Sequence, residues 1–143
     1  MMRQKFKKEE FLQILSGASI FVSFFCAWLY NGGLTYIKGS ELSYIIIHPL
    51  FLFKFIYLLP ILGLANVYYG WTRKYHSKLS WATAIVTFLV LWSIGSFSNR
   101  SQDLVTGNGF YLAIIGLIAS AASIYVVRKE QSATQSETKG INN

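Results

Sequence analysis

The stretch FYLAIIGLIASAASIYVV, residues 110–127, carries no charged side chain and is long enough to cross a bilayer as one helix. Three other apolar stretches of similar length precede it, at residues 11–30, 50–70 and 81–97. A helix rises about 1.5 Å per residue and the hydrocarbon core is about 30 Å thick, so about 20 residues span it. The sequence therefore predicts an all-α membrane protein, an antiparallel bundle of four transmembrane helices.

The composition and the charge distribution agree with this prediction. Apolar residues make up 53% of the chain and charged residues 13%, whereas a soluble domain averages about 25% charged residues. The four spans fill one domain, residues 1–130, and leave no separate soluble domain. Residues 131–143 are polar without apolar periodicity, which predicts a disordered cytoplasmic tail.

The basic residues predict the orientation in the membrane. Four lie before the first stretch, three lie between the second and third, and three follow the fourth, whereas the other two connections hold only Lys38 and Arg100. Basic residues concentrate on the cytoplasmic side of a membrane, so both termini are expected in the cytoplasm. The expected location is the cell membrane, that is, a bacterial inner or plasma membrane. The net charge of +7 is thereby explained by topology, and no nucleic-acid partner is expected.

The connection at residues 31–49 is expected to face outward, as is that at 98–109. Residues 34–37 and 42–46 favour β-structure, and Lys38, Gly39 and Ser40 between them favour a turn, which predicts a short β-hairpin over the bundle. An alternative is that residues 43–47 extend the second helix.

Small and polar residues recur at helical spacing in the fourth and first spans. In the fourth span they form one narrow stripe: Gly109, Ala113, Gly116, Ser120 and Ser123. In the first span the stripe contains Gln13, Ser16, Ser19, Ser23 and Cys26. Such stripes let helices approach closely and form hydrogen bonds. They predict a helix-packing interface. The fourth span is expected to pack on the first span of the same chain or on the fourth span of another copy, and a pore lining is the alternative for the first span.

The second span holds the polar residues that stand out within the membrane region. Lys54 lies near its outer end, where its side chain either reaches the interface or lines a path with Tyr57 and Asn66. Asn66 is also suited to a hydrogen bond with a neighbouring helix. Pro60 lacks the N–H that would bond to Ile56, which predicts a kink there.

The sequence offers little for catalysis or for a cofactor. His48 and His76 are predicted on opposite sides of the membrane, so they cannot share a metal ion. None of the six acidic residues lies in a span. No Ser-His-Asp set or nucleophile motif is evident. We therefore expect no catalytic residue, no cofactor and no metal site.

The layout resembles that of small four-helix membrane proteins of prokaryotes, whose topology is similar to that of claudins. The likeness lies in the glycine-rich first outer connection, Gly32-Gly33 through Ser43, and in the fourth helix, which opens Gly-x-Gly-Phe-Tyr-Leu and continues through Gly116. Claudins carry a tryptophan and a cysteine pair in the first connection. Both are missing here, so the resemblance does not imply a paracellular barrier function.

These observations predict a non-enzymatic, multi-pass membrane protein. We expect it to act through protein–protein contacts, as an accessory subunit, a membrane sensor or an immunity-type protein. Its expected partners are the lipid bilayer and either itself, as a homo-oligomer, or another membrane protein. The alternative is a small oligomeric transporter or channel, with Lys54, Tyr57 and Asn66 along its path.

Overall fold

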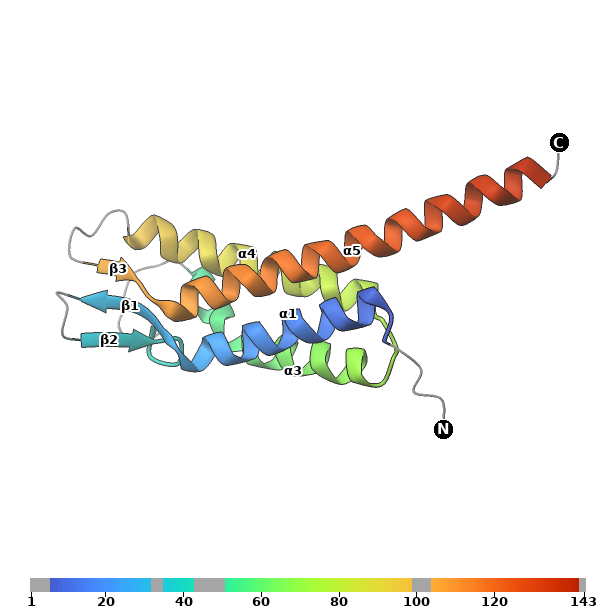
Figure 1. Cartoon of the computed structure of the whole chain (residues 1–143). Helices are drawn as coiled ribbons and strands as arrows, with labels where there is room; N and C mark the ends of the chain where they lie inside the picture. Colours follow the sequence, from blue (N-terminus) through green and yellow to red (C-terminus); the bar gives the residue numbers. More distant parts are fainter. Residues whose placement is uncertain (1–5, 32–34, 43–50, 99–103, 142–143) are drawn as a thin grey trace.

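The computed structural model describes residues 6–31, 35–42, 51–98 and 104–141. The chain is mostly helical with a small three-stranded sheet. Its elements are α1 (Lys8–Phe25), β1 (Ala27–Asn31), β2 (Thr35–Lys38), the 3₁₀ helix η1 (Phe51–Tyr57), α3 (Leu58–Trp71), α4 (Ser77–Ser98), β3 (Leu104–Thr106) and α5 (Asn108–Ile141). The helices run alongside one another, with the sheet at one end and both chain termini at the other (Figure 1).

Helix α1 is shorter than the predicted span of residues 11–30. It begins where the Glu10 side chain accepts a 2.9 Å hydrogen bond from the Lys7 backbone N–H, and it ends at Phe25 because Cys26 is extended (φ −82°, ψ 164°). The indole N–H of Trp28 donates to the Ser23 carbonyl at 2.6 Å, which fixes the change of direction. The last residues of the predicted span therefore form strand β1 instead.

The sheet has the order β2-β1-β3, and both pairs are antiparallel. A hairpin is present, but its first strand is β1, which the sequence placed in the first helix. Strand β2 pairs with β1, and the predicted pairing of residues 34–37 with 42–46 falls largely on residues 43–46, which lie outside the described residues. Strand β3 comes from the second outer connection, and the Gly107 N–H donates to the Trp28 carbonyl at 2.8 Å just beyond it.

The second apolar stretch contains two helical segments. Residues 51–57 form η1, which passes into α3 through Tyr57 in the right-handed helical region. Pro60 lies in the first turn of α3, where its missing N–H leaves few helical bonds unmade. The irregularity of this stretch is thus the 3₁₀ segment before Pro60 rather than a kink in the middle of an α-helix.

Helix α3 ends in a Schellman motif. The N–H of Arg73 donates to the Gly70 carbonyl and that of Lys74 to the Tyr69 carbonyl, at 3.2 and 3.0 Å. This geometry requires a left-handed residue at the position of Arg73, whose φ is 57°. The tight ending turns the chain directly into α4.

Helix α5 extends to Ile141 and so covers residues for which the sequence predicts a disordered tail. Beyond the bundle it carries Ser132 and Thr134, whose hydroxyls donate to the carbonyls four residues earlier, of Arg128 and Glu130, at 3.0 Å each. No glycine or proline interrupts the helix between Arg128 and Lys139, so its backbone hydrogen bonds continue beyond the bundle.

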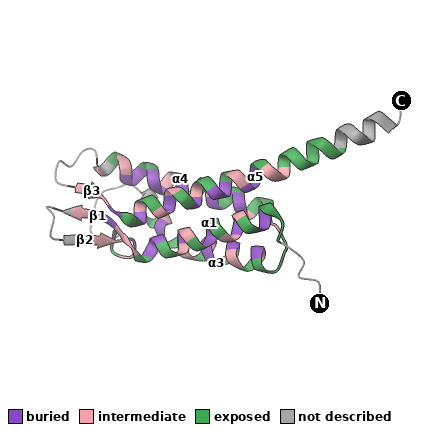
Figure 2. Cartoon of the chain, viewed as in Figure 1, coloured by how far each residue is buried: buried purple, intermediate pink, exposed green. Residues whose placement is uncertain are grey.

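Each helix of the bundle has a buried face and an exposed face (Figure 2). The exposed faces carry many large apolar side chains, and the buried faces contain both apolar side chains and uncharged polar ones. By length and composition, two helices in the described part are able to cross a membrane: α4 over Ser77–Ser96 and α5 over Asn108–Thr134. Helix α1 begins with three charged residues and α3 has only 14 residues. The crossing of all four therefore remains a prediction.

Candidate functional site: a polar seam inside the bundle

The buried interior changes character along the bundle axis. Toward the sheet it is apolar, with Ile20, Phe24, Ile56, Val90 and Ile94 in its core. Toward the termini it contains many polar residues, among them Glu9 and Glu10 in the first turn of α1. We call eight uncharged members of this group the polar seam: Gln13 and Ser16 of α1, Asn66 of α3, Ser80, Thr83 and Thr87 of α4, and Ser120 and Ser123 of α5.

Asn66 is the centre of a hydrogen-bond network that joins three helices. Its side-chain oxygen accepts a 3.1 Å bond from the Gln13 amide on α1. Its side-chain nitrogen donates to the Thr83 hydroxyl on α4 at 2.6 Å and to the Leu62 carbonyl at 2.9 Å. Thr83 in turn donates to the Leu79 carbonyl at 2.8 Å. Polar side chains of this kind hold helices together in an apolar surrounding.

A second polar contact joins α4 to α5. The Ser120 hydroxyl donates to the Ser80 backbone carbonyl at 3.1 Å. Ser123 donates within its own helix, to the Ser120 carbonyl at 2.7 Å. Ser120 is therefore the member of the α5 stripe that forms a hydrogen bond across a helix interface.

Close backbone contact between α1 and α3 depends on two glycines. A Cβ atom on Gly17 would lie 2.5 Å from the Gly63 carbonyl oxygen and 2.8 Å from the Val67 nitrogen. A Cβ on Gly63 would lie 2.8 Å from the Gly17 carbonyl oxygen. These distances leave no room for a side chain at either position, so the two helices touch through their backbones.

The predicted stripe of α5 packs on α1 of the same chain. Gly109 faces Trp28 and the Ser23 carbonyl, and Gly116 faces Ile20. Both glycines are buried, as are Ala113, Ser120 and Ser123. On α1, Ser16 and Ser23 are buried and Ser19 is half-buried. The sequence predicted that this stripe packs either on the first span of the same chain or on the fourth span of another copy. In the structure it packs on α1 of the same chain.

The predicted path residues do not come together. Lys54 and Tyr57 are exposed near the sheet, where the Tyr57 hydroxyl donates to the Ser40 carbonyl at 3.2 Å. Asn66 is buried in the polar seam, and Pro60 is half-buried between them along the chain. Lys54, Tyr57 and Asn66 thus line no common space inside the chain.

The chemistry available in the polar seam is that of neutral groups. Four of its oxygen atoms lack a hydrogen-bond partner within the described ranges: Gln13 Oε1, Ser16 Oγ, Ser80 Oγ and Thr87 Oγ1. A buried group left unpaired costs about 1–3 kcal/mol. The eight residues of the seam carry hydroxyl and amide groups and include no carboxylate, imidazole or thiol. Among the described residues no group of three metal-ligating side chains occurs.

Sequence reasoning missed Gly17, Gly63 and the structural role of Trp28. The two glycines lie within helical stretches, and such positions commonly mark close contact between helices. This signal was present in the sequence. Trp28 offered no comparable signal, because a tryptophan at the end of an apolar stretch is typical of the membrane interface.

Comparisons of the chain with protein-family models, curated proteins and solved structures found no match.

Proposed function

We propose that this chain is a four-span membrane protein that acts through contacts with other proteins rather than through chemistry of its own. The observation that carries the proposal is that large apolar side chains cover the exposed surface of the bundle while several polar side chains are buried inside it. Every helix of the bundle exposes large apolar residues, exemplified by Val22, Ile61, Ile85 and Ile118. The interior of the same helices holds Gln13, Asn66 and the other residues of the polar seam. This arrangement suits an apolar solvent.

The lengths of the helices support four crossings. Helix α1 has 18 residues and is about 27 Å long. The seven residues of η1 and the 14 of α3 together extend about 35 Å, since a 3₁₀ helix rises about 2 Å per residue. Both values lie close to the hydrocarbon thickness of about 30 Å. Helix α1 packs along both α3 and α5, so it shares the surroundings of α5.

Exposed aromatic residues near both ends of the bundle support the same arrangement. Trp71, Trp81 and Tyr125 lie toward the termini, and Trp92 and Tyr111 lie toward the sheet. Along α5, Tyr111 and Tyr125 are 14 residues apart, which is about 21 Å. Aromatic side chains concentrate at the two membrane interfaces. The distribution of the basic residues supports an orientation with the termini in the cytoplasm and the sheet outside.

The sheet offers the contact surface. In the order β2-β1-β3 both outer strands have one edge without a strand partner in the described part of the chain. The exposed side chains include Tyr36 on β2 and Val105 on β3. Unpaired strand edges bind extended segments of other proteins through backbone hydrogen bonds. We therefore propose that the sheet end binds a protein segment outside the membrane.

The alternative function, an oligomeric transporter, has less support. Its candidate residues Lys54 and Tyr57 lie on the surface, and Asn66 is bonded to two neighbouring helices. A path would have to run between copies of the chain rather than through one bundle.

Site-specific photo-crosslinking in native membranes tests the proposed contact. A photoreactive amino acid replaces Val105 at the sheet, and Ile118 in the middle of α5 is the matched control because both are exposed apolar residues. We expect a protein adduct of defined mass from position 105 and only lipid adducts from position 118. The same photoreactive amino acid is also placed at position 36, since Tyr36 is exposed on β2. Lipid adducts alone from both position 105 and position 36 would contradict a protein contact at the sheet.

A further inference from the structure

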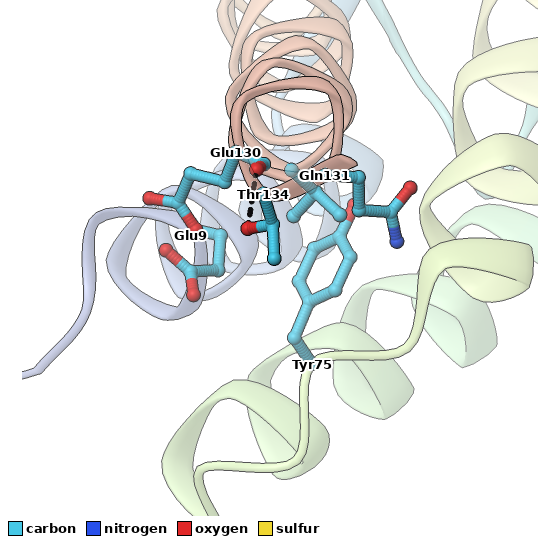
Figure 3. A pocket seen from close by; sticks show the side chains of 6 residues that line it. Glu9, Tyr75, Glu130, Gln131 and Thr134 are labelled. Atoms are coloured by element: carbon cyan, nitrogen blue, oxygen red, sulfur yellow. Dashed lines mark hydrogen bonds between the residues drawn. The ribbon is translucent and has the colours of Figure 1, made fainter. Parts of the chain in front are cut away.

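A pocket of about 710 Å³ opens at the end of the bundle where the termini lie (Figure 3). It is formed by the first turn of α1, the connection between α3 and α4, and α5 where it leaves the bundle. Its lining residues are Glu9, Tyr75, Val127, Glu130, Gln131 and Thr134. In Figure 3 the carboxylates of Glu9 and Glu130 point to the same side, and Tyr75 rises from the connection toward α5.

Two acidic residues in one pocket are unusual in this chain, which has six acidic and 13 basic residues. Glu9 is only 6% exposed. Neither the Glu9 nor the Glu130 carboxylate has a hydrogen bond or an ion pair with any residue that the structure describes. Arg128, one of the two cations that precede Glu130 on α5, stacks over the Trp81 ring, 5.2 Å from its centroid. A buried carboxylate without a partner is costly, so the pocket favours a cation.

The remaining lining indicates which kind of cation. The Tyr75 hydroxyl is buried and also lacks a partner among the described residues. Its ring and the Val127 side chain give the pocket an aromatic and an aliphatic wall. Carboxylates with an aromatic face recognise organic ammonium groups, and aliphatic surface accommodates methylene groups. The volume falls in the range of about 300–1,000 Å³ that is typical for small organic ligands.

We propose that this pocket binds an alkylammonium group, held by the carboxylates of Glu9 and Glu130 and by the hydroxyl and ring of Tyr75. The group belongs either to a free polyamine or to a lysine side chain of a protein partner, since both present the same primary ammonium on an alkyl chain. This proposal rests on the local geometry and does not depend on the number of membrane crossings or on the sheet contact.

The test is calorimetric titration of the full chain in an uncharged detergent. Spermidine and an end-blocked trilysine peptide are the two probes, and MgCl₂ is the third titrant. We expect saturable binding of at least one amine probe. Glu9→Gln and Glu130→Gln should each weaken binding by about tenfold or more, because each removes a charge-assisted hydrogen bond. Tyr75→Phe should weaken binding less, because it keeps the ring.

The control variant is Glu41→Gln, which removes the same charge at the sheet end, where Glu41 is exposed. It should leave amine binding unchanged. The tighter of the two amine probes identifies the source of the ligand. The proposal is overturned by binding of neither probe, by equal weakening in Glu41→Gln, or by magnesium that binds to the same carboxylates as tightly as the amines. If Glu9→Gln does not fold, as judged by circular dichroism, Glu130→Gln and Tyr75→Phe decide the outcome.

Discussion

Trp28 joins the helical bundle to the sheet. Its indole N–H donates to the Ser23 carbonyl at 2.6 Å, its ring packs edge-on against Phe110 at 6.3 Å between centroids, and its backbone carbonyl accepts from Gly107. Gly109 and Gly39 approach it so closely that a Cβ on either would lie within 3 Å of the indole. A single side chain therefore fixes the end of α1 and the start of α5 together.

Replacement of Trp28 by alanine should lower the free energy of unfolding by about 3–5 kcal/mol, because it removes a fully buried aromatic side chain and its hydrogen bond. Unfolding in mixed micelles measures this loss. The matched control is Trp92→Ala, since Trp92 is 66% exposed on the bundle surface, and its effect should stay below about 1 kcal/mol. Equal losses in the two variants would show that Trp28 is no more important than a surface tryptophan.

Asn66 should be energetically coupled to Gln13. A double-mutant cycle with Gln13→Ala and Asn66→Ala should give a coupling free energy of about 0.6–1.7 kcal/mol, because the two amides share a hydrogen bond in an apolar surrounding. The control cycle pairs Asn66→Ala with Ser23→Ala, since the Ser23 hydroxyl donates to the Ile20 carbonyl in its own helix. That cycle should be additive, and additivity in both cycles would argue against the network.

At the scale of the elements, the helices are held by backbone contact as much as by side chains. Gly17→Ala should destabilise the bundle by about 1–3 kcal/mol, because its Cβ meets the backbone of α3 and the helices must separate. Gly95→Ala is the matched control, since a Cβ there meets nothing within 4 Å. That change should be neutral or stabilise by up to about 1 kcal/mol. Thermal unfolding of both variants in the same detergent distinguishes packing from helix propensity, and a stable Gly17→Ala would contradict the close crossing.

The interior of the elements was more predictable than their ends. The small stripe of Gly109, Gly116 and Ser120 follows from helical spacing alone, and the structure buries all three. The end of α1 was not predictable in the same way, because Trp28, Leu29 and Tyr30 suit an apolar helix and a strand equally well. Their pairing with β2 and β3 depends on residues up to 77 positions away, which no local pattern contains.

The candidate sites show the same division. Asn66 was predicted to bond to a neighbouring helix, and its partner Gln13 belongs to the polar stripe that helical spacing predicts for the first span. The pocket beside Glu9 was not predicted. It depends on how far α5 continues past the bundle and on where the turn at Arg73 directs Tyr75. These are properties of the tertiary arrangement, and the polar composition of residues 131–134 argued against a helix there.

At the scale of the whole molecule, the protein has four layers along the axis of the bundle. The sheet lies at one end and the termini lie at the other (Figure 1). From the sheet toward the termini follow the apolar layer of the bundle, the polar seam and then the acidic pocket beside the termini. The central claim is that the bundle crosses the membrane four times, which places the sheet and the termini on opposite sides.

Cysteine accessibility tests that claim most directly. In a Cys26→Ser background, single cysteines replace exposed residues at the sheet end, Glu41 and Val105, and at the other end, Lys7, Lys74 and Ser132. We expect a membrane-impermeant maleimide to label positions 41 and 105 on intact cells, and to label positions 7, 74 and 132 only after the membrane is permeabilised. Labelling of positions 7 and 41 from the same side would contradict the account, because α1 would then not cross the membrane.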